Sequence, residues 1–143
     1  MINYTEHKKR AIRYINKKPR LSHTDPLFKK CQILKLHDLY ELHTKLFVHD
    51  FKHKCLPTCL HNLFTENKNA TRQQYNLQVE KPRTTYSSKL PKHQFVKLWN
   101  EISSNIQMIQ RRNVFKSTLK KNMLYKYASE VKCNNQFCPD CQK

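Results

Sequence analysis

The sequence predicts a mainly α-helical protein, and three observations support that fold class. Apolar residues recur at spacings of three and four over residues 36–53, which places them on one face of an α-helix. Residues 7–18 and 114–127 combine apolar residues with lysine or arginine at helical spacing. The chain of 143 residues contains no glycine, so we expect its helices to end at Asn or Lys, or before a proline.

Composition limits the size of the core and indicates the kind of partner. Only 38% of the residues are apolar and the mean hydropathy is −0.87, so we expect one modest core or two small ones. Lysine and arginine number 28 against 10 aspartate and glutamate residues, which gives a formal net charge of +18. Such an excess predicts a polyanionic partner, nucleic acid in preference to an anionic membrane.

The same inventory excludes several classes of protein. The P-loop, the dinucleotide-binding fingerprint and the nucleophile elbow all require glycine, which this chain lacks. No apolar run reaches membrane-spanning length, and the N-terminal residues lack the apolar stretch of a signal peptide. The six cysteines are scattered unevenly, unlike those of a secreted disulfide scaffold. We therefore expect an intracellular protein, in the nucleus or the cytoplasm, with reduced thiols.

The first expected helix covers residues 7–18 and ends at Pro19. Its apolar residues, expected to pack inward, are Ala11, Ile12 and Ile15. Its basic residues, expected to contact phosphate, are Lys9, Arg10, Arg13 and Lys17. A second, short helix is expected over residues 26–31. Thr24 or Asp25 can cap it, and Pro26 suits the first helical position because no intrahelical N–H bond is required there.

Residues 36–53 form the longest expected helix, around which any core should be built. Asp38 and Glu41 lie in its first turn, where carboxylates complement the helix dipole. The apolar face is expected to contain Leu36, Leu39, Tyr40, His43, Leu46, Phe47 and Phe51. The Leu-Pro pair at residues 56–57 should stop the helix. Cys55 and Cys59, with two histidines nearby, are interpreted as a chance cluster because no second cysteine pair lies at zinc-finger distance.

Residues 63–93 are rich in Asn, Thr, Ser, Lys and Gln and are expected to be an extended linker. Tyr75, Leu77 and Val79 alternate, so a short strand is an alternative. Cations interleave with aromatic residues here, a pattern that suits single-stranded nucleic acid but is shared by flexible polar linkers. The residues in question are Arg72, Lys81 and Arg83 with Tyr75 and Tyr86.

A second helical unit is expected over residues 94–128, with Trp99 as its core anchor. Asn113 is expected to cap its last helix. The apolar edge of that helix should contain Phe115, Leu119, Met123 and Tyr127. A parallel basic edge, expected to bind nucleic acid, contains Arg112, Lys116 and Lys120.

Residues 129–143 form a cysteine-containing tail. Cys133, Cys138 and Cys141 follow the pattern C-x4-C-x2-C. Two thiolates at C-x2-C spacing can share one zinc ion, but a structural site needs a fourth ligand and the sequence does not identify one. A working site and an incomplete site are equally compatible with this pattern. Zinc is thus an optional cofactor, and we expect that none is required.

Eight short motifs occur in order along the chain: KKRAIR at residues 8–13, HTDPLF at 23–28, ILKL at 33–36, DLYEL at 38–42, NATR at 69–72, PRT at 82–84, KLWNEI at 97–102 and NVFKSTLKKNML at 113–124. Together they resemble the region that follows the polymerase palm in non-LTR (LINE-type) retrotransposon reverse transcriptases. The ordered set spans nearly the whole chain. Cys55, Cys59 and the serines at 103–104 depart from the family pattern.

This resemblance implies a thumb-like helical bundle over residues 1–62, followed by the linker, the second helical unit and the tail. In that family the region grips the template–primer duplex, so RNA and DNA are the implied partners, along with the rest of the polymerase. Catalysis is not implied, because polymerase chemistry needs paired aspartates that hold metal ions. The only aspartates are Asp25, Asp38, Asp50 and Asp140, none of them adjacent.

The sequence therefore favours a nucleic-acid-binding fragment of a reverse transcriptase that is not itself an enzyme and has no membrane partner. Two alternatives stay open. One is a free-standing basic RNA-binding protein with a zinc site, and the other is a retroelement relic without function.

Overall fold

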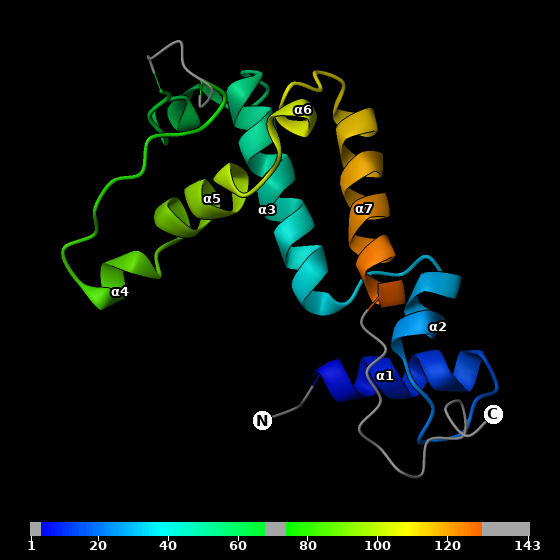
Figure 1. Cartoon of the computed structure of the whole chain (residues 1–143). Coiled ribbons are helices and arrows are strands. Elements are labelled where there is room, and N and C mark those ends of the chain that lie inside the picture. Colours follow the sequence, from blue (N-terminus) through cyan, green and yellow to red (C-terminus); the bar gives the residue numbers. More distant parts are fainter. Residues whose placement is uncertain (1–3, 68–73, 130–143) are drawn as a thin grey trace. The chain divides into compact units, whose positions relative to one another are not determined.

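The structure is a computed structural model that describes residues 4–67 and 74–129. It is mainly α-helical, which confirms the predicted fold class (Figure 1). The helices are α1 (Tyr4–Ile15), α2 (Asp25–Lys30), α3 (Leu36–Lys52), η1 (Thr58–Leu60), α4 (Thr85–Ser88), α5 (Pro91–Asn100), α6 (Ser104–Gln107) and α7 (Arg112–Ser129). One isolated antiparallel bridge, between Glu66 and Leu77, accompanies them in the described residues.

The chain divides into two compact units. The terminal unit comprises Met1–Leu39 and Lys120–Lys143, and the central unit comprises Tyr40–Leu119. Residues 63–93, for which a linker is expected, fall within the central unit. Helices α3 and α7 each contribute residues to both units.

In the terminal unit, α1 contacts α2 and buries fewer residues than expected. Ile12 is buried, whereas Ala11 and Ile15 are exposed, which corrects the predicted inward face. Helix α2 begins at Asp25, one residue before the predicted start, so Pro26 lies in its first turn. Thr24 occupies the N-cap position, but its side chain makes no capping hydrogen bond. Leu27, Phe28 and the connector residue Leu34 are buried in this unit.

Three helices end with a non-glycine residue in the left-handed region. Lys17, Gln32 and Lys54 have φ values of 52°, 55° and 55°. In each case the next residue donates its N–H to a carbonyl five residues earlier, as in a Schellman motif: Lys18 to Arg13, Ile33 to Phe28, and Cys55 to Asp50. A glycine-free chain thus ends α1, α2 and α3 with this motif, at a conformational cost that glycine avoids. Helix α3 ends before its Leu-Pro pair for this reason.

The bounds of α3 agree with the sequence prediction, but its predicted buried face is partly wrong. Leu46 and Phe51 are buried, and Leu39 and Phe47 are half-buried. Leu36, Tyr40 and His43 are exposed instead. The face that the fold buries also includes Leu42, Thr44, Lys45, Val48 and His49. Apolar and amphipathic residues occupy most of the circumference of α3, so periodicity alone does not select which of them meet a neighbour.

Aromatic rings fill the core of the central unit. The ring of Phe64 meets those of Phe51 and Phe47 edge to face, with centroids 5.0 and 6.5 Å apart, and Phe47 meets Phe95 at 5.6 Å. Trp99, which is 1% exposed, lies 5.9 Å from Phe115 between ring centroids. The prediction that Trp99 anchors a core is confirmed.

The extended segment around Leu77 is part of this core and is not a free linker. The side-chain amide of Asn100 pairs with the backbone of Leu77, as a neighbouring strand would. Its Oδ1 accepts from the Leu77 N–H and its Nδ2 donates to the Leu77 carbonyl, both at 2.9 Å. Trp99 Nε1 donates to the carbonyl of Tyr75 at 3.0 Å, and Gln107 Nε2 donates to Asn76 Oδ1 at 3.2 Å. These bonds satisfy a backbone that has little sheet pairing of its own.

Helix α7 begins one residue before the predicted cap. Asn113 lies inside its first turn, because the helical hydrogen bond from Phe115 N–H already reaches the Arg111 carbonyl at 3.0 Å. The predicted apolar edge is correct, since all four of its residues are buried. They are Phe115, Leu119, Met123 and Tyr127.

Candidate nucleic-acid interface

The structure places the nine predicted nucleic-acid-binding residues in different environments. Five are exposed: Arg10, Lys17, Arg83, Arg112 and Lys116. Three are half-buried: Lys9, Arg13 and Lys120. Arg72 and the tail cysteines Cys133, Cys138 and Cys141 lie outside the described residues.

The cationic stripe predicted on α1 is not continuous. Lys9 Nζ lies 2.8 Å from Glu6 Oε1, and this hydrogen bond and charge hold the pKa of Glu6 below its ordinary value. Arg13 Nε donates to the Ser22 carbonyl at 2.9 Å, so it fastens the α1–α2 connection. Lys17 lies beyond the end of α1, in its left-handed cap. Arg10 is the residue of this group that stays exposed on the helix itself.

On α7, the basic edge contains one tethered and one available cation. Arg112 Nε donates to both carboxylate oxygens of Asp50, at 2.9 and 3.0 Å. Lys116, one turn further on, is exposed and has no ion pair with any residue that the structure describes. Lys121, which was not singled out from the sequence, is also exposed on this helix.

The two tyrosines of the predicted aromatic pattern differ. Tyr75 is half-buried, and its carbonyl accepts hydrogen bonds from Trp99 Nε1 at 3.0 Å and Lys52 Nζ at 3.2 Å. Tyr75 therefore has a structural role. Tyr86, on α4, is 78% exposed and lies in sequence between the exposed cations Arg83 and Lys89. An exposed ring flanked by cations can stack on an unpaired base.

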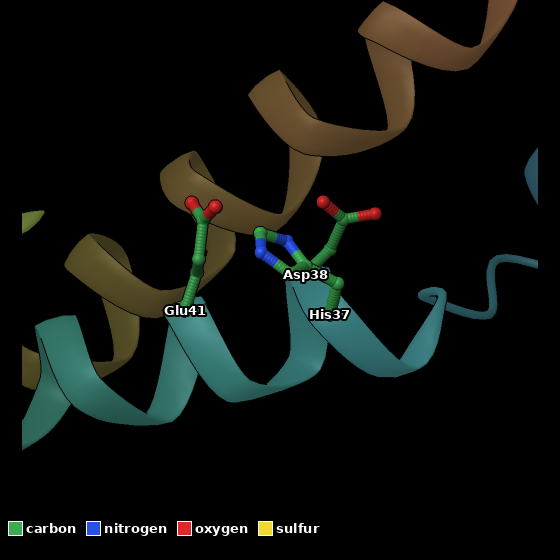
Figure 2. A group of neighbouring side chains, drawn as sticks. All are labelled: His37, Asp38 and Glu41. Carbon is green, nitrogen blue, oxygen red and sulfur yellow. The ribbon is translucent and has the colours of Figure 1, made fainter. Parts of the chain in front are cut away.

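A group of potential metal ligands lies on α3 (Figure 2). One ligand atom each from His37, Asp38 and Glu41 lies within 4.8 Å of the others. Both carboxylates already have partners, because Asp38 accepts a hydrogen bond from the Tyr127 hydroxyl and Glu41 Oε2 lies 2.8 Å from Lys45 Nζ. Because both carboxylates already contact other side chains, the group is interpreted as structural.

The cysteines near the end of α3 do not form a ligand set in the described part of the chain. Cys55 and Cys59 are free and exposed. Cys55 Sγ is directed at the His53 carbonyl at 3.5 Å, and His61 Nε2 lies 2.8 Å from the Leu56 carbonyl.

Sequence reasoning missed one feature of the terminal unit, a cavity of about 260 Å³ lined by Lys8, Lys9 and Lys35. Lys8 and Lys9 are adjacent on α1, but Lys35 is far along the chain, and no periodicity connects it with them. Only the packing of α1 against α2 and its connector brings these three cations to one cavity.

Comparisons with protein-family models, with curated proteins and with solved structures returned no match to this chain. Within the described ranges, no helix has the length and apolar character needed to cross a lipid bilayer.

Proposed function

We propose that this chain is the nucleic-acid-binding, thumb-like part of a LINE-type reverse transcriptase and binds the sugar–phosphate backbone without catalysing polymerisation. The excess of cations carries the proposal. Ten carboxylates can neutralise at most ten of the 28 lysine and arginine side chains. A folded surface with this uncompensated charge attracts a polyanion and releases its counterions.

The described contacts support backbone binding over base reading. The exposed cations Arg10, Lys116 and Lys121 come from two helices, and the described residues contain no β-ribbon that could enter a groove. Tyr86 adds a stacking surface, which favours a partner with single-stranded portions. The ordered motifs shared with LINE-type polymerases point to a template–primer duplex as that partner, inside the nucleus or cytoplasm.

The stretch at residues 97–100, which resembles the KLWN motif of that family, makes contacts that support the central unit. Trp99 and Asn100 both bind the extended backbone at residues 75–77. In this interpretation the motif maintains the central unit that presents Lys116 and Tyr86, and it does not contact nucleic acid itself.

A lysine substitution on α7 tests the proposal. Lys116→Gln should lower the slope of log K against log salt on a B-form duplex by about 0.9, because one phosphate contact is lost. The matched control is Lys92→Gln, since Lys92 is exposed but already lies 2.8 Å from Glu80 Oε2 and should leave the slope unchanged. Binding is measured by fluorescence anisotropy from 50 to 300 mM salt, roughly the range over which such contacts weaken. Equal slopes for both variants and the parent would show that α7 does not contact phosphate.

A further inference from the structure

The cavity in the terminal unit has the donors of an oxyanion site. Its lining includes the ammonium groups of Lys8, Lys9 and Lys35, the hydroxyl-bearing residues Thr5 and Thr24, and the carboxylate of Asp25. These residues come from α1, from the start of α2 and from the connector before α3. The cavity volume, about 260 Å³, is large enough for a phosphate group with part of a neighbouring sugar.

Two of the three lysines are held in place by carboxylates. Lys35 Nζ lies 2.9 Å from Asp25 Oδ2, and its ammonium also lies 4.7 Å from the centre of the Tyr127 ring. Lys9 Nζ lies 2.8 Å from Glu6 Oε1. These contacts fix the positions of two ammonium groups before any anion binds. Less side-chain entropy is therefore lost on binding.

Lys8 supplies the third positive charge of the cavity lining. It is half-buried, and it makes no ion pair with any residue in the described ranges. Thr24 is 7% exposed and occupies the N-cap of α2, yet its hydroxyl accepts no capping hydrogen bond. Lys8, Thr5 and Thr24 therefore bring one ammonium group and two hydroxyl groups to the wall of this cavity.

We infer that this cavity binds one phosphate group of a nucleic-acid strand, with Lys8 as the main cationic contact. The inference rests on the proposed function and names a particular contact for it. After Lys9 and Lys35 are offset by Glu6 and Asp25, one positive charge remains, and a phosphodiester carries one negative charge. Several N–H and O–H donors around one cavity suit the multiple acceptor oxygens of a phosphate.

The experiment compares the full-length chain with Lys8→Gln and with the matched control Lys30→Gln, because Lys30 is exposed on α2 and does not line the cavity. Both variants lose one positive charge, so long-range attraction falls equally in both. Affinity for a 5′-hydroxyl RNA–DNA hybrid is measured by fluorescence anisotropy. We expect Lys8→Gln to weaken binding about 10-fold, the effect of losing a charged hydrogen bond, and Lys30→Gln to weaken it by less than about 3-fold.

A 5′-phosphorylated version of the same hybrid identifies the source of the phosphate. Equal losses on both hybrids for Lys8→Gln indicate a phosphodiester within the strand, and a loss confined to the phosphorylated hybrid indicates a terminal phosphate. Both results support the inference. Equal, small losses for Lys8→Gln and Lys30→Gln overturn it. Lys8 makes no ion pair with any described residue, so Lys8→Gln should keep the parental melting temperature, and Lys30→Gln should keep it as well. Thr5→Val provides a second cavity variant that alters no charge.

Inorganic phosphate separates this inference from the proposed function. In amide NMR spectra of the full chain, phosphate but not acetate should shift the resonances of Thr5, Lys8 and Thr24. If these shifts occur while the hybrid does not bind, the cavity inference stands and the proposed function fails. If the hybrid binds with strong salt dependence but phosphate shifts none of these resonances and Lys8→Gln behaves like Lys30→Gln, the proposed function stands and the cavity inference fails.

Discussion

At the scale of single residues, Tyr127 shows how this small chain satisfies polar groups inside its terminal unit. The side chain is 3% exposed, its hydroxyl donates to Asp38, and the same oxygen accepts the Lys35 backbone N–H at 3.0 Å. Burial, with a contribution from the hydrogen bond to Asp38, raises the pKa of Tyr127 above its ordinary value of 10.0. Sequence periodicity predicted that Tyr127 would be buried, but it did not identify Asp38 and Lys35 as its partners, because contacts across 89 and 92 residues leave no local signal.

Removing the Tyr127 hydroxyl should destabilise the fold. Tyr127→Phe leaves the Asp38 carboxylate and the Lys35 N–H without this partner, which should lower the free energy of unfolding by about 1–3 kcal/mol at pH 7. The control is Tyr14→Phe, since Tyr14 is 88% exposed and its hydroxyl should contribute within about 0.5 kcal/mol. Urea unfolding followed by circular dichroism measures both. Indistinguishable midpoints for the two variants would contradict the buried hydrogen bonds.

The raised pKa of Tyr127 also predicts how stability depends on pH. Because the folded state keeps the phenol protonated, the unfolded state loses its proton first, so this contribution to stability is complete below about pH 10 and falls as the pH rises above it. The free energy of unfolding should therefore decrease more steeply between about pH 9.5 and 11 in the parent than in Tyr127→Phe. If the free energy of unfolding fell equally with pH in the parent and in Tyr127→Phe over that interval, the pKa of Tyr127 in the folded state would not be raised.

At the scale of helices, sequence analysis succeeded where a helix has a single buried face, and it failed where several faces were candidates. On α7 the four predicted core residues are buried, together with Leu124, which the predicted edge omitted. Helix α3 has apolar or amphipathic residues around most of its circumference. Periodicity therefore predicted a buried face that included Leu36, Tyr40 and His43, but these three residues are exposed. The segment at residues 75–77 was assigned to a linker because its hydrogen-bond partners, Trp99 and Asn100, are side chains distant in sequence.

The glycine-free helix ends give a stability prediction. Lys54 has a φ of 55°, where a residue with a Cβ is strained by about 1–2 kcal/mol and glycine is not. After allowing for the greater freedom of glycine in the unfolded chain, Lys54→Gly should raise the free energy of unfolding by about 0.5–1 kcal/mol. The matched control is Lys89→Gly. Lys89 also caps a helix, but its φ is −86°, so this substitution should not raise the free energy of unfolding. A loss of stability in Lys54→Gly would refute the left-handed cap.

The face of α3 that the fold buries can be tested directly. Leu46 is 2% exposed, so Leu46→Ala should lower the free energy of unfolding by about 2–5 kcal/mol through lost burial and the cavity left behind. Leu36 on the same helix is 46% exposed, and Leu36→Ala should cost less than about 1 kcal/mol. Chemical denaturation of both variants gives the comparison. Similar costs at the two positions would place α3 in a different orientation.

At the scale of the whole molecule, the fold class and the overall charge could be predicted from the sequence, because helical spacing and composition can be read without a structure. The sequence was not sufficient for the cavity at Lys8, since that cavity depends on contacts between distant segments. Each of the three described aspartates contacts another side chain of the protein: Asp25 contacts Lys35, Asp38 contacts Tyr127, and Asp50 contacts Arg112.

The proposal that the chain does not polymerise follows from these contacts and from the lack of adjacent aspartates in the sequence. Purified protein should therefore extend no primer on RNA or DNA templates with either Mg²⁺ or Mn²⁺. The assay is gel-resolved primer extension, with an active polymerase as the positive control. Template-dependent extension that persists in repurified protein and disappears when Asp25, Asp38 or Asp50 is replaced by Asn would refute the proposal.

The most direct test of the proposed function is the salt dependence of nucleic-acid binding by the full chain. If the surface cations hold the partner, log K on a B-form duplex should fall linearly with log salt, with a slope of several units and about 0.9 for each phosphate contacted. Scrambling the duplex sequence should change the affinity little, because the proposed contacts are to the backbone. Affinity that does not change with salt, or that equals the affinity for a neutral polymer, would contradict the central role of the +18 charge.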